Sequence, residues 1–220
     1  MRSRLLTSVL VLALFVAPVT AQDTDPFMRH PSVHPDGDRI AFSYQGDLWT
    51  VPVGGGTPER LTIHEAYEGH PRWGPDGTQI AFTSDRYGNS DLYVMGAAGS
   101  TPERLTYHST GDALGGWTPE GQLLFTTRRT YAQAEWSDEI YTVNADGGTP
   151  DRRLDAVGSS PRMSPDGRFI AFVRGYNDVT KKGYEGPADR NVWVYDTETD
   201  TYTQVTTYAG NDHSPVWTGP

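Results

Sequence analysis

The sequence predicts an all-β chain, folded as a β-propeller whose blades are four-stranded antiparallel sheets. One motif, His-Pro-Arg-Trp-Gly-Pro-Asp-Gly-Thr-Gln-Ile-Ala-Phe at 70–82, recurs along the chain. Its Asp-Gly or Glu-Gly pair returns after 40, 44 and then 46 residues, beginning at positions 36, 76, 120 and 166. Repeats of about 40–45 residues are typical of propeller blades, each of which contains four strands.

Each repeat contains the pieces of four strands, as the second repeat illustrates. Pro75-Asp76-Gly77 predicts a tight reversal, because proline presets φ, aspartate bonds to nearby backbone and glycine accepts φ > 0. Ile80–Phe82 is an apolar run without a polar face, which is typical of a strand covered on both sides. A second apolar run at Asp91–Met95, a Gly-rich turn at Ala98-Gly99 and a short strand around Arg104–Thr106 complete the blade.

We expect four blades and the start of a fifth, as a fragment of a six-bladed ring. The predicted blades span about 30–62, 63–106, 107–154 and 155–206, and the next one begins at 207–220, so that the incomplete propeller occupies 30–220. Closing six blades would take roughly 50–100 further residues at this period. An open arc leaves the outer faces of its terminal blades in water, which we expect around Phe42, Trp49, Phe172 and Trp193, and its free strand edges favour self-association. Homo-oligomerisation of the full-length protein is left open.

The N-terminus has the features of a cleavable signal peptide at 1–21, followed by a short segment at 22–29. Arg2 and Arg4 precede an apolar stretch at Leu5–Val16, and Val19-Thr20-Ala21 fits the small-residue cleavage pattern. The stretch is too short for a membrane span, and no other stretch is comparable. We therefore expect a periplasmic or secreted protein without a membrane span after cleavage; the alternative is an uncleaved anchoring helix.

Composition excludes several function classes. The chain has no cysteine, so disulfides and thiolate metal sites are excluded. Removal of the signal peptide leaves 16 basic against 28 acidic residues, a net charge of −12. Such a surface repels polyanions, so nucleic acid is not an expected ligand. No cofactor motif is present.

Catalytic and metal motifs are absent or misplaced. His64 and His70 are six residues apart, whereas the zinc-protease motif needs histidines at i and i+4 of a helix. No Gly-x-Ser-x-Gly elbow occurs. We therefore assign no catalytic residue and no metal ligand. Asp85-Arg86, which follows a buried strand, is expected to form a local ion pair.

Loop lengths differ between the two faces of the predicted propeller. On one face the connections between strands are short, because they are the Pro-Asp-Gly and Gly-Gly turns. On the other face the connection inside each blade lengthens along the chain, from Tyr44–Gly46 through Ser84–Ser90 and Arg128–Asp138 to Gly175–Arg190. Variable loops on a rigid scaffold often bind ligands, so we expect peptides or a protein partner on this face; extra length that merely fills solvent is an equal alternative.

The repeat resembles the TolB-type propeller unit, a WD40-like family, with its Pro-x-Trp-Ser-Pro-Asp-Gly, Ile-Ala-Phe and Arg-Leu-Thr blocks. The fourth repeat carries Lys-Gly-Tyr-Glu-Gly-Pro-Ala-Asp-Arg-Asn-Val-Trp at 182–193, which is similar to an insertion in the N-terminal six-bladed propeller of tricorn-type serine peptidases. The Pro-Phe-Met-Arg-His-Pro opening at 26–31 resembles extracytoplasmic tricorn homologues. In the longest connection of the loop face we choose Tyr176, Lys182, Tyr184 and Arg190 as contact residues for a peptide or partner.

The resemblance implies a non-catalytic propeller that guides oligopeptides to a catalytic domain elsewhere in a secreted serine peptidase. In that family the serine and histidine lie in later domains, so no catalytic residue can be carried over to these 220 residues. The archaeal tricorn is cytosolic, and the signal peptide departs from that pattern. Two other classes stay open: a TolB-like periplasmic adaptor that binds proteins, and an enzyme of prolyl-oligopeptidase or amidohydrolase type preceded by a propeller.

Signal cleavage after Ala21 predicts that the mature protein begins at Gln22. N-terminal sequencing and intact mass of the protein exported by a secreting host should give that residue. Retention of Met1 on a soluble product inside the cell would contradict the expected compartment.

Overall fold

The computed structural model describes residues 27–130, 138–175, 189–208 and 210–218. These residues form sixteen strands in four antiparallel sheets, and within each sheet the strands follow chain order. The first two sheets contain β1 (Arg29–Val33), β2 (Arg39–Tyr44), β3 (Asp47–Pro52) and β4 (Glu59–Arg60), then β5 (Glu68–Trp73), β6 (Gln79–Ser84), β7 (Asp91–Gly96) and β8 (Glu103–Arg104). The last two contain β9 (Ala113–Trp117), β10 (Gln122–Thr127), β11 (Glu139–Asn144) and β12 (Asp151–Val157), then β13 (Ser159–Met163), β14 (Phe169–Arg174), β15 (Asn191–Asp196) and β16 (Thr201–Gln204).

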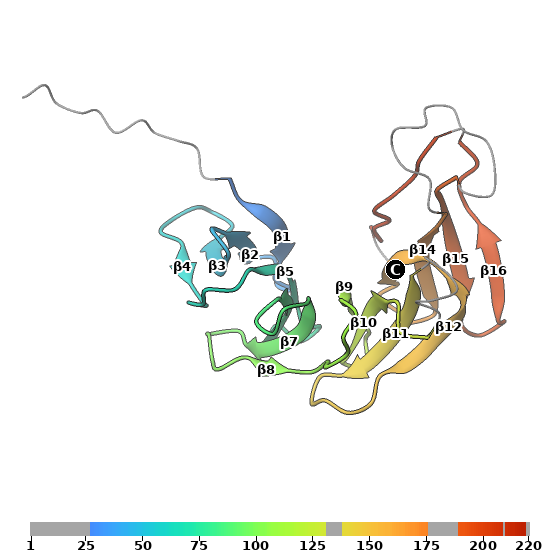
Figure 1. The fold of residues 1–220 in the computed structure, drawn as a ribbon. Helices are drawn as coiled ribbons and strands as arrows, with labels where there is room; N and C mark the ends of the chain where they lie inside the picture. Colours follow the sequence, from blue (N-terminus) through green and yellow to red (C-terminus); the bar gives the residue numbers. More distant parts are fainter. Residues whose placement is uncertain (1–26, 131–137, 176–188, 209, 219–220) are drawn as a thin grey trace, which may run out of the picture.

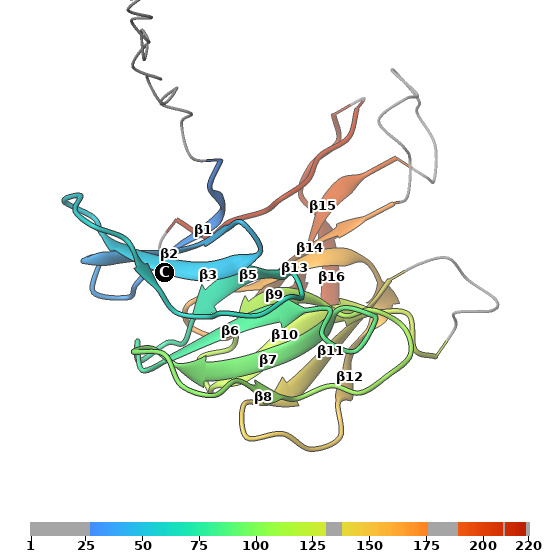
Figure 2. The same cartoon turned by 60° about the vertical axis from the view of Figure 1, so that its left-hand side comes forward.

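The four sheets lie side by side as the blades of an arc (Figure 1), which confirms the predicted all-β propeller architecture. We number the sheets blades 1 to 4 in chain order. The first strand of each blade faces the inside of the arc, and the fourth strand lies at its rim (Figures 1 and 2). Within the described ranges, no helix is long and apolar enough to cross a membrane.

Tight turns join the first two strands of each blade, as the Pro-Asp-Gly motif predicts. In blade 2 the Gly77 N–H donates to the Gly74 carbonyl at 3.0 Å, and Gly77 has a φ of 71°. The equivalent glycines 37, 121 and 167 have φ values of 75°, 81° and 76°. Because an L-residue with a side chain is strained in this backbone region, glycine is favoured there.

The first strand of blades 1, 2 and 4 is bulged at a residue that precedes proline. His30, His70 and Ser160 have φ values of 53–54°, and the strand register shifts across each of them. A bulge adds one residue to one strand and re-aims the side chains around it. At this step blade 3 has Leu114-Gly115 in place of a residue and a proline, and the register of β9 also shifts there.

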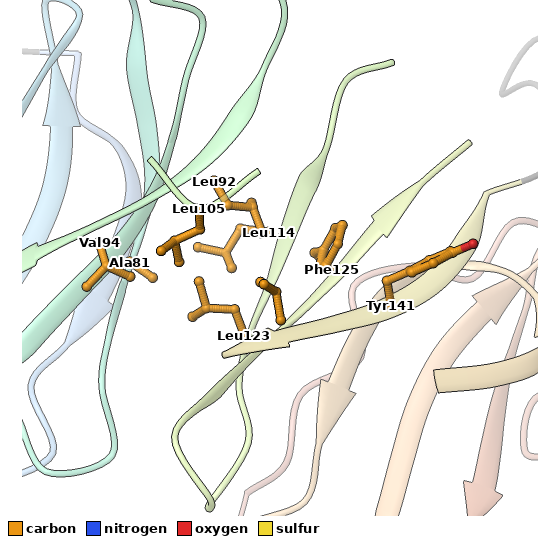
Figure 3. Packing of buried hydrophobic residues seen from close by; sticks show 9 residues of the cluster. Ala81, Leu92, Val94, Leu105, Leu114, Leu123, Phe125 and Tyr141 are labelled. Atoms are coloured by element: carbon orange, nitrogen blue, oxygen red, sulfur yellow. The ribbon is translucent and has the colours of Figure 1, made fainter. Parts of the chain in front are cut away.

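Burial between blades explains the apolar runs. In β6, Ile80 and Phe82 pack toward blade 1, whereas Ala81 packs toward blade 3. Figure 3 shows the second of these interfaces, where Leu92 and Val94 of blade 2 meet side chains of blade 3. The partners on blade 3 are Leu114, Leu123, Phe125, Tyr141 and Val143. The expectation of strands covered on both faces is therefore confirmed for β6.

The expected exposure of the terminal blades is wrong for two of its four residues. Phe172 is fully buried because it points toward blade 3, in a cluster with Leu124 and Ile140, and not out of the arc. Phe42 is 4% exposed, and Trp49 lies opposite it on the neighbouring strand of blade 1. Trp49 and Trp193 are half-buried.

An ion pair fastens the third strand of a blade to its fourth strand. Asp91 at the start of β7 bonds to Arg104 of β8 at 2.7 Å, and the Leu92 N–H donates to Thr106 Oγ1 at 2.9 Å. Blades 1 and 3 repeat the pair as Asp47–Arg60 and Glu139–Arg152. Blade 4 has Asn191 and Gln204 in the same places, so both charges are replaced together. This arrangement explains the Arg-Leu-Thr blocks of the sequence.

Replacing Gly77 by alanine tests the contact between the tight turns of neighbouring blades. A Cβ at Gly77 would lie 2.2 Å from Nε2 of His34 in blade 1, whereas a Cβ at Gly121 meets nothing within 4 Å. We expect Gly121→Ala to lower the free energy of unfolding by about 1–2 kcal/mol, the cost of positive φ alone. Gly77→Ala should cost about 1–3 kcal/mol more, because the His34 ring must also shift. Equal losses of the two variants in urea titrations would contradict this contact.

Candidate functional site

A cavity of about 630 Å³ lies where the first strands of the blades converge. We call it the axial cavity. Its walls come from β1, β5, β6, β9, β10 and β13, from Ser214, and from loops of the face that carries the longer connections. The lining residues are His30, His70, Arg72, Thr83, Ser90, Gly111, Asp112, Ala113, Leu114, Thr126, Asp138, Ser159, Ser160, Pro161, Arg162 and Ser214. The predicted loop face is therefore hollowed at its centre.

Two histidines from neighbouring blades stack in the axial cavity. The ring centroids of His30 and His70 are 3.6 Å apart, with 27° between the planes. Both residues have positive φ just before a proline, so the bulges of β1 and β5 bring the two rings together. Burial lowers the pKa of His70 to about 4, helped by the charges on His30, Arg72 and Arg162. Burial, together with Arg72 and Arg29, also lowers the pKa of His30. Both rings are therefore neutral at pH 7.

Two arginines converge on one carbonyl oxygen at the wall of the same cavity. Arg162 Nη1 donates to the Gly115 carbonyl at 2.6 Å, and Arg72 Nε donates to it at 3.5 Å. Each arginine also bonds to the carbonyl of its preceding proline, at 3.0 Å for Arg72 and 2.8 Å for Arg162. Gly115 has no room for a side chain, because a Cβ there would lie 2.6 Å from the Pro161 oxygen.

No carboxylate of the described residues pairs with either of these guanidinium groups, which bind carbonyl oxygens. Burial lowers the pKa of Arg72, and burial and the neighbouring Arg72 lower the pKa of Arg162 to about 10. The two carboxylates in the cavity wall do not offset them, because each already pairs with another arginine. Asp112 binds Arg129 at 2.7 Å, and Asp138 binds Arg128 at 2.7 Å.

Indole N–H groups tie the first strands of neighbouring blades together beside the cavity. Trp73 donates to the Ser32 carbonyl at 3.1 Å, Trp117 to the Arg72 carbonyl at 2.9 Å, and Trp217 to the Arg162 carbonyl at 3.0 Å. These bonds fix the backbone from which Arg72 and Arg162 project. The tryptophan of the repeat thus positions the cavity wall.

Three histidines that do not line the axial cavity have local structural roles. His64 Nδ1 accepts the Ala66 N–H at 2.9 Å, and His108 Nδ1 accepts the Thr110 N–H at 3.1 Å. His213 Nδ1 lies 3.1 Å from the hydroxyl of its neighbour Ser214, with no carboxylate of the described residues bonded to the imidazole. A nucleophile–base pair needs such an orienting group. His64, His108 and His213 therefore form no nucleophile–base pair with an orienting carboxylate among the described residues.

The expected ion pair between Asp85 and Arg86 is wrong. Arg86 bonds to Glu68 at the start of β5, and Asp85 accepts the Tyr67 N–H at 2.8 Å. Glu68 is fully buried, so the guanidinium gains more there than beside the exposed Asp85.

Three of the four predicted contact residues, Tyr176, Lys182 and Tyr184, lie outside the described residues. Arg190 is described: its N–H donates to Asn211 at 3.4 Å and its carbonyl accepts the Asp212 N–H at 2.8 Å. It joins the fourth-blade connection to the 207–213 link and does not line the axial cavity.

The sequence reasoning missed the cavity residues. A sequence feature that could have indicated these residues is a repeated Pro-Arg pair. Pro71-Arg72 and Pro161-Arg162 occupy the same place in the first strand of blades 2 and 4, after a histidine and a serine respectively.

Comparison with known proteins gives a consistent picture. Residues 25–220 match the model of the tricorn protease N-terminal β-propeller domain. Tricorn protease homolog 1 of Streptomyces coelicolor is 39% identical over 70 residues, which cover 32% of this chain and 6% of that protein. A Tricorn-like protease N-terminal subunit of Sulfurisphaera tokodaii is 28% identical over 167 residues, which cover 73% of this chain and 84% of that protein. The match thus spans a small part of the Streptomyces relative and most of the Sulfurisphaera one.

Solved structures share the fold. The crystal structure of the tricorn protease superposes with a TM-score of 0.70 at 24% identity, covering 88% of this chain and 20% of that one. TolB from Acinetobacter baumannii gives a TM-score of 0.64 at 22% identity, covering 82% of this chain and 44% of that one. At these identities the likeness concerns the fold alone.

The stacked histidines predict a loss of stability in acid. In the unfolded chain His70 takes up a proton below its usual pKa of about 6.5, but in the folded chain only near pH 4. The free energy of unfolding should therefore fall as the pH drops from 6.5 to 4 and level off below that, as far as this group is concerned.

The variant His70→Asn removes this group, and asparagine tolerates the positive φ at this position. Urea titrations at a series of pH values should show a shallower acid loss for it than for the wild type. His64→Asn, outside the cavity, is the matched control. An unchanged pH slope in His70→Asn would contradict the depressed pKa.

Proposed function

This chain belongs to the family of tricorn protease N-terminal β-propeller domains, and we propose that it is the part of a tricorn-like serine peptidase that guides oligopeptides. In this proposal the axial cavity is the path of the peptide, and the catalytic residues come from another part of the parent protein. The observation that carries the proposal is the cavity itself, which opens among loops of the face with longer connections.

The size and walls of the axial cavity suit a short extended peptide. Its volume of about 630 Å³ falls in the range of roughly 300–1,000 Å³ that is usual for ligand sites. Serine and threonine hydroxyls line it next to the two arginines, so a peptide backbone would meet both donors and acceptors. Rigid strands hold these groups, while the loops around them vary in length, which is the common plan of binding sites.

We further propose that this guidance takes place outside the cytoplasm. The support is the sequence of residues 1–21, with its basic start, apolar core and small-residue cleavage pattern. The absence of cysteine from the chain agrees with an oxidising compartment. The net charge of −10 argues against nucleic acid as a partner.

A TolB-like periplasmic adaptor that binds other proteins is the second candidate function. The face with longer loops supports it as well, and the shared fold with TolB is compatible with it. The two functions differ in what occupies the axial cavity, because an adaptor would present the loops to a folded partner.

Blocking the cavity tests the guiding function. Ala113 lines the cavity and its side chain is exposed, and the chain contains no other thiol, so Ala113→Cys gives one labelling site within the propeller. In the full-length peptidase, coupling a bulky maleimide to this position should lower kcat/KM for a long fluorogenic oligopeptide severalfold. Hydrolysis of a dipeptide-sized substrate should change less.

Thr101→Cys, exposed near the Gly-rich turn on the opposite face, is the matched control and should lose no activity on labelling. Equal activity of the labelled and unlabelled Ala113→Cys protein would exclude the axial cavity as the peptide path. Protection of the thiol by a folded protein but not by oligopeptides would favour the adaptor.

A further inference from the structure

Two arginines of the axial cavity have no acidic partner within residues 27–130, 138–175, 189–208 and 210–218. Among the described residues, five half-buried arginines, 86, 104, 129, 152 and 168, each bind a carboxylate. Arg72 and Arg162 instead bind only the carbonyls of Gly115 and of the prolines before them. Carbonyl oxygens carry only partial charge, so no full negative charge in the described part of the chain compensates either guanidinium group.

Both guanidinium groups keep unused donors. The carbonyls engage Nε and Nη1 of Arg72 and Nη1 of Arg162. A guanidinium has five N–H bonds, so Nη2 of Arg72 and both Nε and Nη2 of Arg162 lack an acceptor within the described part of the chain. Two like charges that share one carbonyl repel each other unless an anion lies between them.

Other groups in the cavity leave the two charges unscreened. Asp112 and Asp138 are already neutralised by Arg129 and Arg128. The stacked rings of His30 and His70 are neutral or cationic in either protonation state, so they cannot supply negative charge. The cavity is thus locally positive in a chain whose net charge is −10.

We propose that Arg72 and Arg162 form a binding site for a carboxylate group of an oligopeptide in the axial cavity. This inference rests on the proposed function, and it adds which peptides the cavity prefers. Guanidinium groups bind carboxylates through charged and often paired hydrogen bonds, and both arginines project from a backbone fixed by indole bonds. The carboxylate is either the C-terminus or an Asp or Glu side chain, since both present the same group.

Three synthetic peptides of one neutral sequence, titrated into the full-length protein, test the site. The first has a free C-terminus, the second a C-terminal amide, and the third a C-terminal amide and one internal glutamate. Loss of charged hydrogen bonds of this kind changes affinity roughly tenfold to a hundredfold. We expect the first peptide, the third, or both to bind tighter than the second by such a factor, and the advantage to shrink as salt rises.

The double variant Arg72→Gln/Arg162→Gln should abolish that advantage while it still binds the amide peptide. Arg153→Gln, which removes an exposed arginine of β12 outside the cavity, is the matched control and should keep it. If the double variant does not fold, Arg162→Gln alone and the comparison of peptides on the wild type remain decisive.

Equal affinity of the wild type for all three peptides overturns the carboxylate site and leaves the guiding function standing. An advantage that survives in the folded double variant overturns it too, because other residues would then hold the carboxylate. Binding of none of the three peptides contradicts the proposed guiding function itself, and the carboxylate site falls with it.

Discussion

The structure depends on one constraint, that a sheet with two apolar faces must be covered on both sides. In blade 2, Ile80 and Phe82 need blade 1, whereas Ala81, Leu92 and Val94 need blade 3. Stacking of this kind places the first strands next to one another on the inner side of the arc, where indole bonds such as Trp117 to the Arg72 carbonyl join them. The axial cavity follows from this packing, because polar side chains are left to face the axis.

The parts of the fold that depend on neighbouring residues in the chain could be predicted from the sequence. Pro75-Asp76-Gly77 favours a tight turn through its own residue types, and the positive φ of Gly77 agrees with the expectation. The sequence could not predict that the side chain of Phe172 points toward blade 3. Side chains alternate between the two faces of a strand, but this alternation does not say which face packs against the preceding blade. Arg86 was assigned to its sequence neighbour, but burial favours Glu68, which is 18 residues away.

The candidate site was less predictable than the fold for the same reason. Arg72 and Arg162 are 90 residues apart, and each looks like an ordinary surface charge in its own repeat. Only the stacking of blades brings them to one carbonyl, that of Gly115 in the blade between them. The bulges that aim His30 and His70 at each other were equally hidden, since proline normally disfavours a helical residue before it.

Charge pairing separates the structural arginines from those of the cavity. At the rim of the arc, where Arg104 binds Asp91, the repeat changes both partners together, and blade 4 has Asn191 and Gln204 there. Keeping one charge without the other would leave a buried ion unpaired, which is costly. Arg72 and Arg162 do not follow this pairing rule, because no carboxylate of the described residues accompanies either of them. The chain as a whole is acidic, and at 0.1 M salt the field of a charge extends over only about 10 Å. These two arginines would therefore attract an anion only after it enters the cavity. Their effect is therefore on what stays in the cavity and not on what approaches the protein.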